Sequence, residues 1–128
     1  MSCFWDSILE SLNNLNKINE NNINNFIRFL KDQNVKTENV YWQDEKLSSK
    51  QLDENYEHIN NYDISEVYNG YLCSTCDPFL ILICEIFCIN INHDFIGNLI
   101  IYKNISDLNL NIVFFGSDSG HFFFKKIE

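Results

Sequence analysis

The chain has 128 residues, which suits a single domain over residues 1–128, and its 45% hydrophobic content excludes a disordered polymer. Its formal net charge of −9 repels nucleic-acid phosphates and anionic lipids, so we expect neither a nucleic acid nor a membrane as partner. The start of the sequence lacks the pattern of a secretion signal and the five cysteines are an odd number, so we expect reduced thiols and a cytoplasmic location.

Two amphipathic helices are predicted at the start of the chain. Apolar residues recur every three or four positions over residues 5–15 and again over residues 23–30, as they do on one face of a helix. Ser2 precedes the first of these segments and is expected to cap it. The first helix is therefore expected to begin near Cys3.

The middle of the chain changes from polar to strongly apolar. Residues 31–62 predict loops and short helices, one of them near residues 48–56, and residues 63–67 predict a further helical turn. The pair Asp77-Pro78 is typical of the cap and the first position of a helix. The apolar run that follows, residues 79–88, predicts a buried helix that is too short to span a bilayer.

Strand patterns dominate the rest of the chain. Residues 116–120, with the sequence Gly-Ser-Asp-Ser-Gly, predict a tight turn before the last strand. Helices first and strands afterwards predict an α+β fold, in which N-terminal helices pack on a C-terminal antiparallel β-sheet. The predicted strands are residues 89–91, 98–102, 110–115 and 121–125.

Cys3 and His121 carry the most specific chemical pattern. At the start of a helix, unpaired backbone N–H groups and the helix dipole stabilise a thiolate and can donate to an oxyanion. His121 opens the last predicted strand, and an imidazole can take up and return a proton near neutral pH. Taken singly, a cysteine before a helix is more often a small apolar residue, and a histidine before a strand more often structural.

The order of these parts resembles the OTU family of cysteine proteases over nearly the whole chain. Family members carry a cysteine before an aromatic-containing helix, here Cys3-Phe4-Trp5-Asp6-Ser7-Ile8. They then carry an apolar helix, two further strands and a last strand that opens with histidine and an aromatic residue, here His121-Phe122. The chain looks most like the compact viral members. The papain-like leader and nidovirus proteases share the cysteine-aromatic start and stay an open alternative.

The resemblance implies a viral thiol hydrolase without cofactor or metal. It would cleave after the tail of ubiquitin or a ubiquitin-like protein, with a polyprotein as a further candidate substrate, in the host cytoplasm as part of immune evasion. The expected partner is thus ubiquitin or a ubiquitin-like protein, bound by a monomer. The acidic surface of the chain would suit a basic partner of this kind.

The resemblance also assigns roles to individual residues. Cys3 is the expected nucleophile and His121 the general base and acid. The family often has Asn or Asp two residues after the histidine, where this chain has Phe123, so we expect a dyad. Asp118 and Asn111 are candidates for an additional orienting residue. The residues expected to line the substrate cleft are Trp5, Gly116, Gly120 and Phe122.

Two other patterns favour different functions. Cys73 and Cys76 form a CxxC which, with Cys84 and Cys88, could hold zinc, but no second CxxC follows and no βαβ pattern supports a thioredoxin-like role. Residues 112–120 also resemble a segment of the SMI1/KNR4-like (SUKH) proteins. In that alternative the chain is a non-enzymatic protein-binding module and Cys3 is incidental.

Overall fold

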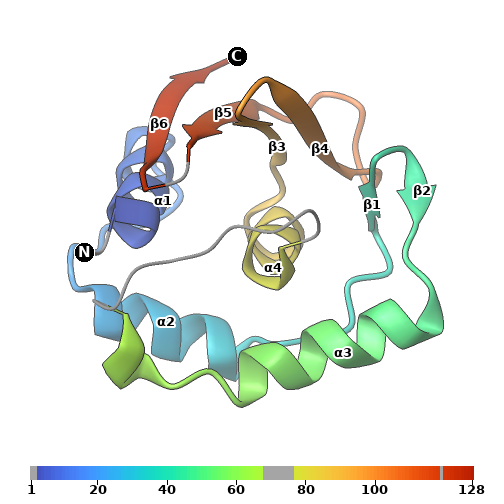
Figure 1. Ribbon diagram of the computed structural model, residues 1–128, viewed down its shortest axis with the longest axis horizontal. Coiled ribbons are helices and arrows are strands. Elements are labelled where there is room, and N and C mark those ends of the chain that lie inside the picture. Colours follow the sequence, from blue (N-terminus) through green and yellow to red (C-terminus); the bar gives the residue numbers. More distant parts are fainter. Residues whose placement is uncertain (1–2, 68–76, 119) are drawn as a thin grey trace.

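Helices and a mixed sheet make up the computed structural model, which describes residues 3–67, 77–118 and 120–128 (Figure 1). The described residues form four α-helices, one short 3₁₀ turn and a six-stranded sheet. The fold is therefore α+β, as predicted. The helices are α1 (Cys3–Asn14), α2 (Ile23–Asp32), α3 (Ser49–Asn60) and α4 (Pro78–Phe87), and the 3₁₀ turn is η1 (Ile64–Glu66).

The strands hydrogen-bond in the order β2-β1-β4-β3-β5-β6. Neighbouring strands are antiparallel except β3 and β5, which run parallel. β2 and β6 are the two edge strands of this sheet. The strands are β1 (Val40–Trp42), β2 (Glu45–Lys46), β3 (Asn90–Phe95), β4 (Asn98–Asn104), β5 (Ile112–Ser117) and β6 (Phe122–Ile127).

The sheet differs from the predicted antiparallel one in three respects. It is mixed, because β5 runs parallel to β3. β5 lies beside β3 on the side away from β4. β1 and β2 come from the stretch 31–62, where Gln43 and Asp44 both have positive φ, 53° and 65°, and connect the two strands in a tight hairpin. Gly116 and Ser117 belong to β5 and not to the predicted turn.

Local capping explains where two of the helices begin. Ser48 and Gln51 form a capping box at the start of α3, each side chain accepting the other residue's backbone N–H. Before α4, Asp77 Oδ1 accepts the backbone N–H of Phe79 at 2.9 Å, and Pro78 occupies the first turn. The helices predicted for residues 5–15, 23–30, 48–56 and 79–88 are confirmed, with the bounds given above.

The helix α4 forms the centre of the molecule. It packs on β1, β3 and β4 on one side and on α3 on the other, so it lies between the sheet and the α2–α3 layer (Figure 1). Its residues from Phe79 to Cys84 are all buried, as expected for a helix that is apolar on every side. Neither α4 nor any other helix in the described ranges is long and apolar enough to cross a membrane.

The sheet covers the helices with its inner face, which is largely apolar and aromatic. A polar pair, His93 and Ser117, interrupts this face. His93 is fully buried, and its Nε2 lies 2.6 Å from Ser117 Oγ. The ring of Phe122 packs beside His93, with 5.1 Å between the ring centroids. Burial lowers the pKa of His93 to about 4, so this histidine is a neutral core residue.

Candidate active site

The start of α1 and the start of β6 meet at one corner of the molecule (Figure 1). Ser7 Oγ donates to the carbonyl oxygen of Phe122 at 3.2 Å, and the rings of Phe4 and Phe122 lie 4.7 Å apart. Cys3 precedes Phe4 in the chain and His121 precedes Phe122. We call this junction of Cys3, Ser7, His121 and Phe122 the α1–β6 corner.

Cys3 is the first residue of α1 and is partly buried against the core. The first N–H groups of any α-helix have no carbonyl partner within the helix. A group that develops negative charge beside Cys3 would lie at the positive end of the α1 dipole. This dipole favours negative charge at the start of α1.

His121 is exposed and stands immediately before β6. Asp118 fixes the backbone in front of it, since the Asp118 carboxylate accepts the N–H groups of Gly120 and His121, both at 2.9 Å. The N–H of Asp118 in turn donates to the carbonyl of His121 at 2.9 Å. These backbone donors hold the pKa of Asp118 below its usual range. Asp118 therefore holds the turn that presents His121, because its carboxylate accepts hydrogen bonds from the backbone of that turn.

Cys3 and His121 share no hydrogen bond within the described residues, and neither side chain makes another hydrogen bond or ion pair there. A working dyad needs about 3 Å between sulfur and ring nitrogen, and such contacts are often longer before substrate binds. The helix α1 and the strand β6 thus lie side by side, but no hydrogen bond connects the Cys3 thiol to the His121 imidazole.

Asn111 does not belong to the α1–β6 corner, contrary to the prediction that it could orient His121. It precedes β5 at the opposite end of the sheet, where its Nδ2 donates to the carbonyl of Glu128 at 3.5 Å. The strand β5 separates it from the turn before His121, a distance of about 17–20 Å. The sequence pattern did not reveal which end of the strand faces the corner.

Two of the residues expected to line a cleft are core residues instead. The Trp5 ring is buried and packs edge-on against the ring of Phe79 at 4.9 Å. Phe122 is buried against Phe4 and Phe115. Both predictions were wrong because large aromatic rings next to a reactive residue are used here to pack α1 onto the sheet.

The two glycines expected at the cleft differ from one another. A side chain at Gly116 has no room, because a Cβ there would lie 2.5 Å from Cζ of Phe123, whose ring covers this position from the neighbouring strand. Gly116 is therefore covered and does not line a cleft. Gly120 is exposed, with open space around its α-carbon, and stays beside His121.

The remaining cysteines give no metal site in the described ranges. Cys73 and Cys76 lie outside the described residues. Cys84 is fully buried in α4, and burial raises the pKa of its thiol, while Cys88 is exposed at the end of that helix. Within residues 3–67, 77–118 and 120–128, no group of three or more His, Cys, Asp or Glu is placed to hold a metal ion.

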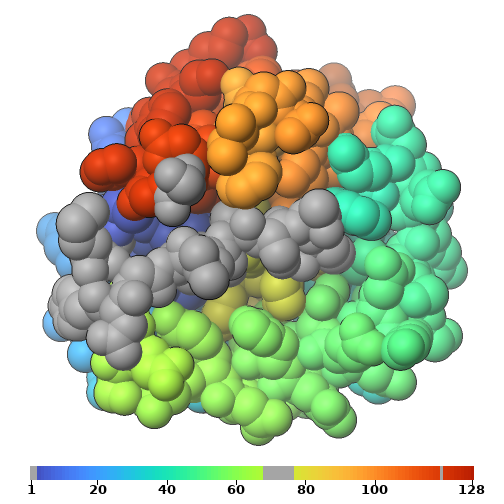
Figure 2. All heavy atoms as spheres, in the orientation of Figure 1, coloured from blue at the N-terminus to red at the C-terminus, as the bar shows by residue number. Residues whose placement is uncertain are grey.

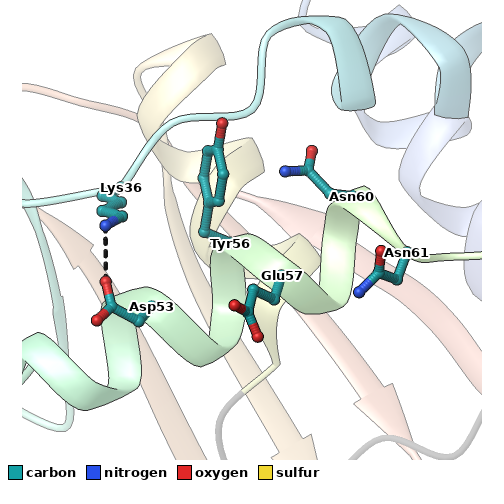
Figure 3. Close-up of a pocket in the computed structure, with 6 residues that line it drawn as sticks. All are labelled: Lys36, Asp53, Tyr56, Glu57, Asn60 and Asn61. Carbon is teal, nitrogen blue, oxygen red and sulfur yellow. Dashed lines mark ion pairs between the residues drawn. The ribbon is translucent and has the colours of Figure 1, made fainter.

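A polar hollow of about 680 Å³ lies along α3 and is separate from the α1–β6 corner. Figure 3 shows Lys36 and Asp53 pointing toward each other across it, with 2.7 Å between Nζ and Oδ1. The hydrogen bond and charge of Asp53 raise the pKa of Lys36. No thiol lines this hollow, so it is not a candidate for the proposed cysteine chemistry; its lining is Lys36, Asp53, Tyr56, Glu57, Asn60 and Asn61.

The sequence patterns missed two features of the corner. The hydroxyl of Ser7 had a detectable signal, because it lies four residues after Cys3 and so on the same face of the helix. The exposed apolar side chains of Ile96 and Leu99 had none, since their place on the same sheet face as Phe123 depends on how distant strands pair. No family model, curated protein or solved structure matches this chain.

Proposed function

We propose that this protein is a cysteine hydrolase of the OTU-like kind, with Cys3 as nucleophile and His121 as general base and acid. The α1–β6 corner carries the proposal. There the helix that begins with Cys3 contacts the strand that follows His121, through Ser7 and Phe122. The mixed sheet beside helices is compatible with such an enzyme.

The reaction is acyl transfer. The Cys3 sulfur attacks the carbonyl carbon at the end of a substrate tail while His121 takes the thiol proton. The positive end of the α1 dipole stabilises the oxyanion that forms. The amide C–N bond then breaks, His121 returns the proton to the leaving amine, and a thioester remains. Water hydrolyses the thioester with His121 as base, which releases the carboxylate and restores the thiol.

The surface beside His121 supports a protein substrate. Phe123, Gly116, Asp94 and Leu99 form one row across four strands, on the sheet face opposite the helices. Leu99 and Phe123 are 51% and 45% exposed, and Ile96 in the adjoining turn is 61% exposed. Figure 2 shows the β3–β4 turn, in light orange, beside the β5–β6 turn, in red. We call Ile96, Leu99 and Phe123 the apolar rim; the Asp94–Lys125 ion pair, with 3.6 Å between Oδ2 and Nζ, lies between Leu99 and Phe123.

The apolar rim and the net charge of −9 favour the same class of substrate. An apolar patch next to a reactive group is typical of a site that binds a folded partner. Negative charge over the whole chain steers a basic partner toward it. Ubiquitin or a ubiquitin-like protein with a narrow C-terminal tail is therefore the proposed substrate.

A covalent probe tests the proposal. Ubiquitin or a ubiquitin-like protein that carries a C-terminal electrophile is incubated with the wild-type chain and with Cys3→Ala. The wild type is expected to form a stable adduct, which shifts its mass by that of the probe. Cys3→Ala is expected to form none, and His121→Ala is expected to react at least about a hundredfold more slowly.

The control variant is Cys88→Ala, which removes the most exposed thiol among the described residues. It is expected to react like the wild type. An adduct that persists in Cys3→Ala, or a wild type that stays unmodified by every ubiquitin-like probe, contradicts the proposed function.

A further inference from the structure

Ser7 links the helix that carries Cys3 to the strand that His121 opens. It lies in the second turn of α1, is buried, and its Oγ donates to the Phe122 carbonyl oxygen at 3.2 Å. Cys3 and Ser7 are four residues apart, so both lie on the helix face that meets β6. The hydrogen bond therefore connects Ser7, one helical turn after Cys3, to Phe122, the residue that follows His121.

The acceptor of this bond is a carbonyl that the sheet itself leaves free. Backbone carbonyls alternate in direction along a strand. The His121 carbonyl accepts the N–H of Asp118 on the β5 side, so the next carbonyl, that of Phe122, points away from β5. β6 is an edge strand, which puts this carbonyl toward α1. The Ser7 hydroxyl satisfies it.

The other contacts between α1 and β6 are aromatic and less directional. The ring of Phe4 packs on the ring of Phe122 at 4.7 Å, and an apolar contact of this kind is not directional. A hydrogen bond weakens steeply when its length or angle changes, so it holds the helix at one position. That position decides how far the Cys3 sulfur lies from the His121 ring.

We propose that Ser7 is a positioning residue whose hydrogen bond to the Phe122 carbonyl holds Cys3 within proton-transfer reach of His121. The inference rests on the proposed function, since it assumes that these two residues act as a dyad. It adds a residue that touches neither substrate nor reacting atoms and that acts through the placement of the helix.

The chain offers a matched control in Ser11. This serine lies in the same helix, one turn further on, and is equally buried. Its Oγ donates to the carbonyl of Ile8 within α1 at 2.9 Å, and so does not tie the helix to the strand. Ser11→Ala removes a buried hydroxyl from α1 without removing a contact with β6.

The test is the pH dependence of Cys3 alkylation by iodoacetamide, read from the mass of the peptide that contains Cys3. No substrate is needed. If His121 forms an ion pair with the thiolate, the wild type alkylates quickly near pH 6, and His121→Ala loses this fast reaction. Near pH 6, Ser7→Ala is expected to react at least about tenfold more slowly than the wild type. Ser11→Ala is expected to react at the rate of the wild type. Thermal melting checks that each variant is folded.

A second pair of variants keeps the test decisive if Ser7→Ala does not fold. Ser7→Thr and Ser7→Val have nearly the same shape and differ in the hydroxyl group. Ser7→Thr is expected to keep the fast reaction and Ser7→Val to lose it. Equal profiles for Thr and Val, a folded Ser7→Ala with the wild-type profile, or a wild type without a His121-dependent reaction would each overturn the inference.

The two proposals fail in different ways. A wild type that shows His121-dependent alkylation, lost in Ser7→Ala, but that reacts with no ubiquitin-like probe contradicts the substrate and supports the role of Ser7. A wild type that reacts with the probe and keeps its alkylation profile in Ser7→Ala supports the proposed function and contradicts the role of Ser7.

Discussion

His93 is an ionisable side chain that the core holds in its neutral form. It is fully buried and bonded to Ser117, and its ring packs against Phe95 and Phe122. Removal from water disfavours the imidazolium, and the nearby charge of Asp94 offsets only part of this effect, so the pKa falls from 6.5 to about 4. A charged His93 would disturb the packing behind Phe122, which is part of the α1–β6 corner.

We therefore expect the protein to lose stability as the pH falls from about 6.5 to about 4. In this window the unfolded chain binds a proton at His93 and the folded chain does not. The free energy of unfolding therefore decreases as the pH decreases. The difference between the two pKa values corresponds to about 3 kcal/mol over the whole window. Urea denaturation at pH 7.5, 6 and 5 measures it. His93→Gln should flatten the dependence, and an unchanged slope in that variant contradicts the assignment.

At the scale of elements, α4 depends on one carboxylate at its start. Asp77 is buried, accepts the N–H groups of Phe79 and Leu80, and donates its own N–H to Tyr102 Oη. Asp77→Ala should lower the free energy of unfolding by about 1–2 kcal/mol, because two N–H groups at the centre of the molecule lose their acceptor. Asp77→Asn keeps an acceptor oxygen and should cost less. Urea denaturation at pH 7 compares the two, and equal losses would show that the cap is not the cause.

Elements with local signals could be predicted from the sequence, and elements that depend on distant pairing could not. The Asp77-Pro78 start and the apolar run after it were sufficient to predict α4. The hairpin at Gln43 and Asp44 was missed because both residues adopt positive φ without the Asn-Gly pair that usually reveals such a turn. The parallel pairing of β3 with β5 has no local signature, since β4 separates the two strands in the chain.

At the scale of the whole molecule, the same limit applies to the candidate site. The chain order of Cys3 and His121 was readable, and the fold brings their elements together. The neighbours that line the site could not be predicted from the sequence. They depend on which side of its helix or strand each side chain occupies. Trp5 and Phe122 turn toward α4 and the sheet core, while Phe123, one residue further, stays half exposed.

Ile96 combines exposure with backbone strain. It sits at φ 50° in the β3–β4 turn, followed by Gly97 at φ 83°. A β-branched residue in the left-handed region is strained, and Asn or Gly would suit position 96 better. With its side chain 61% exposed, the isoleucine gains little burial in return. The two-residue turn requires positive φ here, but it does not require an isoleucine, and a strained residue of this kind favours a functional role such as the proposed apolar rim.

Ile96→Asn should therefore change stability and substrate binding in opposite directions. Asparagine tolerates the left-handed conformation, so the free energy of unfolding should rise by about 0.5–1 kcal/mol. Loss of the apolar contact should raise KM for a ubiquitin-like substrate several-fold and leave kcat unchanged, because the rim binds the folded body and not the scissile bond. Leu108→Asn is the control, an exposed apolar residue in the loop at the far end of the sheet, and should leave KM unchanged. An Ile96→Asn variant that is more stable with an unchanged KM would show that the rim does not bind substrate.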